Sequence, residues 1–552
     1  MLSLSKHGAG FFNGLLGSIR RVPRTRARKT SSTPSRGGGV SSDPRWQHWP
    51  SLEGTLLVML FIVCLACSLV AAGIGWGHTL LGLHAFRQTQ TAFSTYVMLH
   101  GGSWLAYETP VLGAPWAIPF EFPLYQWAVA LVVKCFGIPL DQSGRLVGEL
   151  FFYATLVPAY VLLGSFRVRP RHRLVFLSLL VVSPQYLYWS RSFMIESTAL
   201  FCSMSYLACA VRSLDRWRLH DLTGAALFGA LAAMVKITTF FAFVLAAGLC
   251  FLWAWWRAGP ARFSRPAVIR FVVSAVPIAL LPLVCGVLWT EFADSVRAHN
   301  PLMVSFLTPA TLRRWTFGTS AQRLSSQLWL TLLNRTVPDV IGQSALLVAA
   351  VALVIAGRRR RVLFVACGVL FVSVPLTFTN LHVVHNYYAY ANGVFLIAAI
   401  GWCVVGSLER AERWRWLGAG LLVCAICASL WRYQQVYLPL QRQNPTLLLD
   451  TARIVQTSTT ADDAVLILGL DWDPTLPYYA QRRALMNRDH RPPSDPVMQR
   501  ALANLRDRPV GAMVVCAGAL QQRPLIASWL RVTGLSPMPR RTMSCEIYTR
   551  PT

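Results

Sequence analysis

The sequence predicts a polytopic α-helical membrane protein with a small α/β domain at its C-terminal end. Of the 552 residues, 54% are hydrophobic and only 14% are charged, and apolar runs long enough to span a bilayer recur along the chain. Short arginine clusters separate these runs, as cytoplasmic loops of membrane proteins do. From about Tyr433 onward the composition is polar and turn-rich, which is typical of a domain outside the membrane. These features argue against a soluble fold.

The excess of positive charge is a topology signal rather than a nucleic-acid-binding surface. The formal net charge is +29, but the basic residues lie in short clusters and not on one amphipathic face, so we expect no nucleic acid among the partners. Residues 1–50 are basic, rich in Gly, Ser and Pro, and predict a disordered cytoplasmic tail. We expect no cleavable signal peptide, because no compact apolar core closely follows the initial Met.

The arginine clusters define the expected topology, since cytoplasmic loops are enriched in Lys and Arg. The clusters are the N-terminal tail, RVRPRHR at 167–173, RSLDRWR at 212–218, RAGPARFSR at 257–265, RRRR at 358–361 and ERAERWR at 409–415. A span placed wherever the side must change gives about eleven transmembrane helices. They are 54–76, 143–165, 174–190, 197–211, 221–235, 238–256, 269–290, 339–357, 362–379, 388–406 and 416–431. The N-terminus is then cytoplasmic, the C-terminus is external, and 51–431 forms the transmembrane domain.

Two stretches do not fit ordinary spans. The apolar run from Phe122 to Phe136 has about fifteen residues, whereas a span needs roughly twenty. Because a crossing there would leave RVRPRHR outside, we expect a juxtamembrane or partly inserted helix within an external loop over 77–142. Between the spans 221–235 and 238–256, the external turn is little more than Lys236 and Ile237.

Residues 432–552 are expected to form a periplasmic α/β domain. VLILG at 465–469 and GAMVVC at 511–516 are predicted to be buried strands with helical segments between them. DWD at 471–473 would suit a ligand or metal site or, more commonly, the capping of the following turn or helix. Cys516 and Cys545 can pair if this domain is extracytoplasmic. Most other cysteines lie in apolar runs, where cysteine acts as a small hydrophobic residue.

Four polar segments are predicted to lie on one external face. They are the loop from His84 to Gln126, the turn SRSFMIE ending at Glu196, Lys236, and the segment TNLHVVHNYYAY between Thr379 and Ala391. Polar backbone is excluded from lipid and persists only beside water or within protein, so their convergence indicates a substrate site. A further external segment, 291–338, is long enough for short surface helices.

Glu121 and Glu196 are the candidate catalytic carboxylates. A carboxylate beside a membrane is costly unless it is paired or functional. Glu121 lies in PFEFPLYQW, where Pro119 and Pro123 stiffen the chain and the phenylalanines would raise its basicity by desolvation. For both glutamates the alternative is a charge that complements the dipole of the following helix. Glu149, within an apolar run, is a third charge that needs a partner.

Cations on the same face suggest a site for an anionic phosphate group. The candidate donor-phosphate ligands are Arg87, Arg191, Lys236 and His385, and the candidate substrate-binding residues are Gln88, Gln90, Tyr387 and Tyr388. Taken singly, each cation is more often a snorkelling interface residue, and tyrosine is common at the membrane boundary. The prediction therefore depends on their convergence.

Four motifs together resemble a known family. HAFRQTQTA, FEFPLYQWAVALVVKCFG, SPQYLYWSRSFMIE and the HNYY at 385–388 are similar to motifs of the polytopic GT-C glycosyltransferases, specifically the bacterial family 39 or protein-mannosyltransferase-like group related to lipid A aminoarabinose transferases. The likeness covers roughly residues 52–406. It implies a glycosyltransferase of the bacterial inner membrane that takes a sugar from a polyprenyl-phosphate carrier. The sugar would pass, with inversion, to an envelope glycan, lipid or protein acceptor on the periplasmic face.

The location of the site independently favours such a donor, because nucleotide sugars are cytoplasmic and an external site needs a membrane-borne donor. An acceptor hydroxyl would attack the anomeric carbon while Glu121 or Glu196 removes its proton. The departing lipid phosphate would need cations or a divalent metal ion to absorb its charge. Arg87, Lys236 and His385 are expected to hold it.

The first loop departs from the family pattern. Members commonly carry an acidic pair or a single acid just after the first span, and here Gln88 and Gln90 stand in the RQTQT stretch. This departure argues against a metal anchored in the loop, and it leaves open an inactive scaffold built on the GT-C frame. The other alternative is a transporter or flippase for lipid-linked saccharides, which would show an internal repeat and polar groups at mid-membrane depth.

Overall fold

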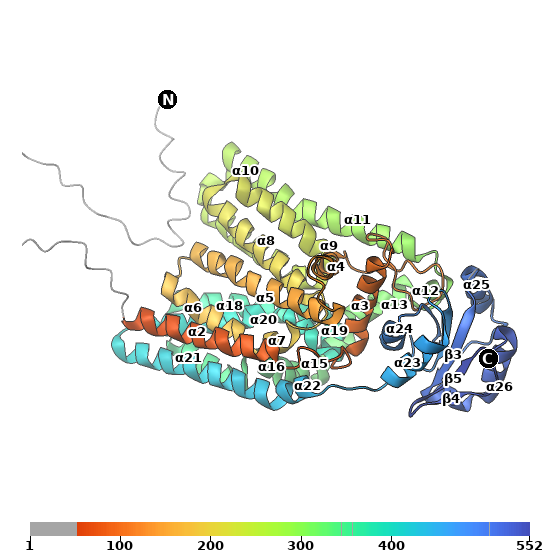
Figure 1. The fold of residues 1–552 in the computed structure, drawn as a ribbon. Helices are drawn as coiled ribbons and strands as arrows, with labels where there is room; N and C mark the ends of the chain where they lie inside the picture. Colours follow the sequence, from red (N-terminus) through yellow and green to blue (C-terminus); the bar gives the residue numbers. More distant parts are fainter. Residues whose placement is uncertain (1–51, 344, 356, 507, 552) are drawn as a thin grey trace, which may run out of the picture.

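The structure is a computed structural model that describes residues 52–551 except 344, 356 and 507. Figure 1 shows a long bundle of helices with a small sheet at one end, next to the C-terminus. The predicted fold class, a polytopic helical protein with a C-terminal α/β domain, is confirmed. The tail predicted over 1–50 lies outside the described residues.

In the described part of the chain, six helices are long and apolar enough to cross a membrane. They are α2 (Leu52–Gly73), α5 (Leu140–Ser165), α9 (Leu219–Arg257), α10 with α11 (Arg265–Arg297), α18 (Arg358–Thr377) and α21 with α22 (Glu412–Arg442). Each coincides with one or two predicted spans. The total of about eleven spans stays a prediction, because length and composition alone identify fewer.

The remaining predicted spans are shorter or more polar helices. They are α6 (Pro170–Val181), α7 (Pro184–Trp189), α8 (Glu196–Arg216), α16 (Val337–Ile341), α17 (Ala345–Ile355) and α20 (Gly393–Leu408). The run 174–190, predicted as one span, is divided between α6 and α7. The break precedes Pro184, because proline has no amide N–H and disfavours a helical conformation in the residue before it.

Helix α9 reverses direction at Lys236, where the backbone is extended with φ −162° and ψ 93°. On the two sides of this turn, Gly229 and Phe240 both lie against the ring of Tyr206 in α8. A straight helix would place these two residues about 16 Å apart. The chain therefore folds back, with the tight turn that the sequence placed at Lys236.

Three of the predicted cytoplasmic clusters meet at one end of the bundle. The imidazole Nε2 of His172 lies 2.9 Å from Oε1 of Glu53, and its Nδ1 lies 3.6 Å from Oε1 of Glu409. Arg360 donates to the same Glu409 at 2.7 Å. These contacts agree with loops that share one side of the membrane.

Much of the first external loop is ordered helix. The HAFRQTQTAF stretch, which the sequence presented as a loop, lies mostly in α3 (Ala85–Leu99), and the predicted short helix is α4 (Leu124–Phe136). Helix α3 is polar yet buried, because Thr89, Thr91 and Thr95 each donate a hydroxyl hydrogen bond to a backbone carbonyl one turn earlier. The predicted surface helices of 291–338 are also present. They are α12 (Pro301–Phe306), α13 (Pro309–Phe317), α14 (Ser320–Leu324) and α15 (Ser326–Thr331).

The HNYY region joins two helices of the bundle. It follows α19 (Thr379–Val384) and forms a 3-10 turn, Asn386–Tyr390, before α20 begins. Helix α19, which precedes this turn, is labelled in the part of the bundle nearer the C-terminal domain (Figure 1).

The C-terminal domain contains a five-stranded mixed sheet of order β2-β1-β3-β5-β4. Its elements are α23 (Leu449–Ser458), β1 (Ala464–Leu468), α24 (Thr475–Ala480), β2 (Ala484–Asn487), α25 (Pro496–Leu505), β3 (Val510–Cys516), α26 (Arg523–Thr533), β4 (Arg540–Arg541) and β5 (Cys545–Thr549). The two predicted strands are β1 and β3, which pair in parallel. The helix before the domain continues through Arg442, beyond the boundary placed at residue 432.

The remaining expectations for this domain concern Cys516, Cys545 and the DWD motif. Cys516 and Cys545 form a disulfide between β3 and β5. Asp473 accepts a hydrogen bond from the amide of Thr475 at 2.9 Å, so it caps the start of α24, which is the structural alternative predicted for this motif.

The first loop and the C-terminal domain share one hydrophobic core. The carbonyls of Pro110 and Val111 accept hydrogen bonds from the amides of Ala484 and Met486, at 2.9 and 3.0 Å. This loop segment thus extends the sheet next to β2. The contact fixes the loop that carries Glu121.

Candidate functional site

Arg87 and Glu121 form an ion pair between α3 and the loop before α4. The second guanidinium Nη of Arg87 donates to the side chain of Gln90, one turn later, at 2.7 Å. Burial disfavours the charge of Arg87, but Glu121, Tyr387, Tyr388 and Glu196 together outweigh burial, and the pKa of Arg87 is raised. The side chain of Glu121 remains 27% exposed, so its carboxylate is accessible.

The backbone around Glu121 is held by two aromatic side chains. The hydroxyl of Tyr107 donates to the carbonyl of Glu121 at 3.0 Å and accepts from the amide of Phe120 at 2.8 Å. The indole of Trp289 donates to the carbonyl of Phe120 at 3.1 Å. These bonds hold the backbone from which the Glu121 side chain projects.

Lys236 and Glu196 form a second, fully buried ion pair. The ammonium Nζ of Lys236 lies 2.5 Å from both carboxylate oxygens of Glu196. Glu196 begins α8, and the turn in α9 brings Lys236 to the same end of the bundle. Their side chains are 1% and 7% exposed, so neither charge would persist there without the other.

Two stacked tyrosines lie against the Lys236–Glu196 pair. The rings of Tyr387 and Tyr388 have centroids 4.8 Å apart, and Nζ of Lys236 lies 4.4 Å from the centroid of Tyr388. Both phenols are also within electrostatic range of Arg87 and Glu196. The two ion pairs and the tyrosines therefore form one cluster.

Two neutral histidines border this cluster. The Nε2 of His84 is 3.0 Å from the side-chain oxygen of Asn386, and its ring centroid is 5.2 Å from that of His385. Burial lowers the pKa of His385 to about 4, and the neighbouring His84 and Lys236 act in the same direction. At neutral pH His385 is therefore uncharged and can offer one ring N–H to an anion.

The structure brings together most of the predicted site. The members of the cluster are Arg87, Gln90, Glu121, Glu196, Lys236, His385, Tyr387 and Tyr388. The side-chain amide of Gln88 donates to the carbonyl of Leu83 at 2.9 Å and accepts from the amide of Phe193 at 3.1 Å, and its role in binding substrate stays a prediction.

Arg191 and Glu149 lie beside this cluster but do not contact its ion pairs. Arg191 lines a separate cavity with Arg145, and Glu149 accepts a hydrogen bond from Ser190 at 3.0 Å. Burial, with the charge of Arg145, lowers the pKa of Arg191 to about 10, so it remains charged at neutral pH. The role of Arg191 as a donor-phosphate ligand stays a prediction.

Sequence reasoning missed His84, Tyr107 and Asn386. His84 stands at the start of the quoted HAFRQTQTA motif, with left-handed φ of 52°, but its partner Asn386 is 302 positions away. Tyr107 lies in a stretch without periodicity. The only local signal was that Asn386 lies inside the HNYY motif.

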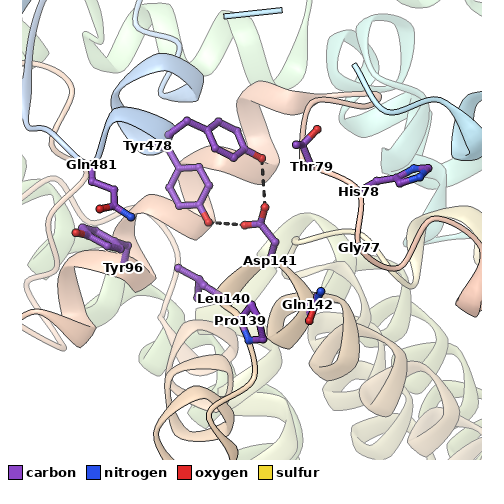
Figure 2. A pocket seen from close by; sticks show the side chains of 11 residues that line it. Gly77, His78, Thr79, Tyr96, Pro139, Leu140, Asp141, Gln142, Tyr478 and Gln481 are labelled. Atoms are coloured by element: carbon purple, nitrogen blue, oxygen red, sulfur yellow. Dashed lines mark hydrogen bonds between the residues drawn. The ribbon is translucent and has the colours of Figure 1, made fainter. Parts of the chain in front are cut away.

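A pocket also opens between the membrane bundle and the C-terminal domain (Figure 2). Asp141, in the first turn of α5, accepts hydrogen bonds from the phenols of Tyr478 and, at 3.2 Å, Tyr479. Neither Glu121 nor Glu196 lines this pocket. Within the described ranges, no group of three or more His, Cys, Asp or Glu side chains is placed to hold a metal ion.

Comparisons with known proteins bear on the architecture. No family model matches the sequence, and no curated protein matches it. Among solved structures, ArnT from Cupriavidus metallidurans bound to undecaprenyl phosphate matches with a TM-score of 0.58 at 14% identity, over 90% of this chain and 98% of that chain. Its apo state matches over the same shares with a TM-score of 0.57, also at 14% identity. This chain has the GT-C fold.

The GT-C likeness extends beyond the residues that first indicated it. A match over 90% of the chain reaches past residues 52–406 into the C-terminal domain. An oligosaccharyltransferase from Archaeoglobus fulgidus matches with a lower TM-score of 0.49, at 12% identity over 83% of this chain and 68% of that chain. At these identities the GT-C comparison concerns the fold, and the roles of individual side chains must come from their geometry.

Proposed function

We propose that this chain is an inverting glycosyltransferase that moves a sugar from a polyprenyl-phosphate-linked donor to an acceptor on the periplasmic face of the bacterial inner membrane. The observation that carries the proposal is the cluster that contains two carboxylate–cation pairs and two stacked tyrosines. A general base and a site for a leaving phosphate require these two kinds of group close together. The acceptor class is an envelope glycan, lipid or protein.

A lipid-linked donor suits the position of the cluster. Helix α3, which carries Arg87, and helix α19, which precedes Tyr387 and Tyr388, lie in the part of the bundle nearer the C-terminal domain (Figure 1). If the basic loops are cytoplasmic, nucleotide sugars cannot reach the cluster, and the donor must arrive within the membrane. The structurally similar ArnT has been observed with undecaprenyl phosphate, a carrier of this kind.

The cations of the cluster are suited to the leaving group. As the bond between the anomeric carbon and the phosphate oxygen breaks, negative charge develops on the phosphate. Arg87 and Lys236 supply fixed positive charge, and neutral His385 supplies an N–H donor. In the resting protein both cations are bound by carboxylates. Donor phosphate would compete for Arg87, and this exchange would release Glu121.

Of the two carboxylates, Glu121 is the better general base. It is 27% exposed and has one cationic partner, so it can reach an acceptor hydroxyl that enters from outside. Glu196 is 1% exposed and both of its oxygens are bound by Lys236, so we assign it the positioning of that lysine. The acceptor oxygen then bonds to the anomeric carbon from the face opposite the phosphate, while its proton passes to Glu121.

The test is release of polyprenyl phosphate from a panel of sugar-loaded carriers by the purified full chain. Glu121→Gln should lower the turnover number by about a hundredfold or more, with little change in donor affinity. Glu196→Gln should instead weaken donor binding, because Lys236 loses the partner that orients it. Glu108→Gln is the matched control, since Glu108 lies in the same loop but pairs with Arg483, at 2.8 Å.

Normal turnover by both Glu121→Gln and Glu196→Gln would refute the carboxylate assignment. A wild-type protein that binds carriers without releasing polyprenyl phosphate from any of them would indicate a GT-C-like scaffold. Movement of an intact lipid-linked saccharide across reconstituted vesicles, with no release, would indicate a transporter.

A further inference from the structure

A second cavity with two arginines lies beside the site but contains neither of its carboxylates. Among its lining residues are Gly75, Gln88, Arg145, Arg191 and Gln441. It is enclosed by the ends of α2 and α22, the first turns of α3 and α5, and the segment that joins α7 to α8. Neither Glu121 nor Glu196 lines it, and neither Arg87 nor Lys236 does.

Arg191 has buried donors without partners in this cavity. Its side chain belongs to a residue that is 7% exposed, and its Nε and Nη2 atoms are buried and make no hydrogen bond. Arg145 is different, because it donates to the carbonyls of Trp76, His78 and Thr79, at 2.7 to 3.1 Å. A buried guanidinium that lacks acceptors is costly, so the unmet donors of Arg191 indicate a missing anionic ligand.

The local charge also favours an anion. In the described chain, the ionisable groups within electrostatic range of Arg191 include Arg145, Glu149, Tyr188 and Tyr433. One carboxylate oxygen of Glu149 accepts a hydrogen bond from Ser190, and among the described residues Arg191 acts on Glu149 through charge rather than through an ion pair. Two cations therefore face one carboxylate and two neutral phenols, and an anion in the cavity would relieve the repulsion between the arginines.

The position of the cavity relative to the membrane indicates which kind of anion would bind there. Spanning helix α2 ends at Gly73, and the helix that includes α22 ends at Arg442, so the cavity lies where two spanning helices leave the apolar layer. Phosphate head groups lie at this level, and basic pockets between transmembrane helices bind them. Gly75, at φ 65°, closes one wall, because a Cβ there would lie 2.7 Å from the carbonyl oxygen of Gln441.

We propose that this cavity is a second anion site, distinct from the Arg87–Lys236 cluster, in which Arg191 binds a phosphate group at the membrane interface. A lipid head group and free phosphate share the chemistry that the site recognises. Arg191 would donate from Nε and Nη2 to two phosphate oxygens, the paired geometry that guanidinium favours. The positive charge of Arg145 would also attract the phosphate, while its N–H groups remain bonded to the carbonyls of Trp76, His78 and Thr79. The proposal concerns binding alone and does not depend on the transferase activity.

The experiment measures ligand binding to the purified full chain at constant ionic strength. The probes are dihexanoyl phosphatidic acid, inorganic phosphate, and dihexanoyl phosphatidylcholine as the zwitterionic reference. Wild type should bind phosphatidic acid saturably, and Arg191→Gln should weaken that binding by about tenfold or more. Arg191→Lys should recover part of it. Arg87→Gln, which alters the other cation site, should retain it.

The outcomes separate the two ligand sources. Competition by inorganic phosphate would identify a general phosphate site, and binding of the lipid alone would identify a head-group site. Equal binding by wild type and Arg191→Gln, loss of binding in Arg87→Gln, or no saturable binding of either phosphate would overturn the proposal.

A second measurement needs no variant. Phenylglyoxal should modify Arg191 in the wild-type protein, and phosphatidic acid should slow that modification at least about fivefold, as followed by peptide mass spectrometry. Arg145, whose donors are occupied, is the internal reference. An unchanged rate of modification at Arg191 with saturating phosphatidic acid would contradict the proposal.

Discussion

Lys236 is a charged residue in the middle of an apolar hairpin, and its burial requires a carboxylate. Such a residue stands out in a sequence because charge within a membrane-spanning run is costly. Its pairing with Glu196 does not follow from the sequence, since Glu196 lies 40 positions earlier. The same holds for Arg87 and Glu121, which are 34 positions apart. The sequence therefore identified the charged groups, whereas their pairing followed from packing.

Replacing Arg87 by lysine tests whether the guanidinium acts as a fork or only as a charge. Arg87 donates to Gln90 and to Glu121 from its two terminal nitrogens. Lysine keeps the charge but presents a single nitrogen, so it cannot serve both partners in the same geometry. We expect Arg87→Lys to lower kcat/KM for donor by about tenfold to a hundredfold. Arg483→Lys, at the half-buried pair with Glu108, is the control, and equal activity of the two variants would show that charge alone suffices.

The buried histidines predict that acid destabilises the protein. Burial lowers the pKa of His382 to about 3 and that of His385 to about 4. The unfolded chain, with ordinary histidine pKa values of about 6.5, binds more protons between these limits, so stability falls as pH decreases through 6.5. For the fully buried His382 the loss is on the order of 2 kcal/mol at pH 5. The apparent Tm should fall between pH 7 and 5.

The matched control for this pH dependence is an exposed histidine. His382→Gln should flatten the dependence of the apparent Tm, whereas His299→Gln should leave it as in wild type. Parallel pH profiles for wild type and His382→Gln would contradict the assignment.

At the level of elements, apolar length predicted helices well but did not predict their ends. The run 174–190 divides where Pro184 interrupts the backbone hydrogen bonds, and α9 reverses at a single extended residue. Helix α3 was read as a loop because its sequence is polar. The hydroxyls of its threonines donate hydrogen bonds to backbone carbonyls of the same helix. The C-terminal domain packs over the surface of the helix. That cover could not be anticipated from local periodicity.

The close approach of α5 to the turn before α8 predicts a steric effect at Gly144. A Cβ at this position would lie 2.1 Å from the ring of Phe193, whose amide is bound by Gln88. We expect Gly144→Ala to destabilise the protein by about 1–3 kcal/mol through overpacking, measured as a lower apparent Tm. Gly368→Ala is the control, because a Cβ there meets no atom within 4 Å. A Gly144→Ala variant as stable as Gly368→Ala would show that the two elements can separate freely.

At the scale of the whole molecule, the C-terminal domain is part of the site's architecture. The segment at Pro110 extends the sheet, and α3 packs on α24 through the contact between Phe93 and Tyr478. These contacts join positions more than 370 residues apart. Sequence patterns predicted β1 and β3 of the five strands, but not that the domain shares a core with the first loop. The loop carrying Glu121 is consequently fixed from both sides.

The proposed donor class depends on which side of the membrane the site faces, and this is a property of the whole molecule. The basic loops meet at one end of the bundle, while the domain with the Cys516–Cys545 disulfide lies near the other. Arginine-rich loops favour the cytoplasm and disulfides persist in oxidising compartments, so we predict that the site faces the outside of the cytoplasm. Alkaline phosphatase fused after Thr552 should be active, and a green fluorescent protein fused there should be dark. Phosphatase fused after Arg361 should be inactive.

The disulfide gives an independent readout of the same orientation. In cells quenched with acid, thiol alkylation of the wild type should reveal two further reactive cysteines only after reduction, and Cys516→Ser with Cys545→Ser should abolish that difference. A fluorescent C-terminal fusion together with reduced cysteines would show that the site is cytoplasmic. A cytoplasmic site has access to nucleotide sugars, so the argument for a membrane-borne donor would no longer hold. Active phosphatase and an oxidised pair would leave a lipid-linked sugar as the donor class that can reach Arg87 and Lys236.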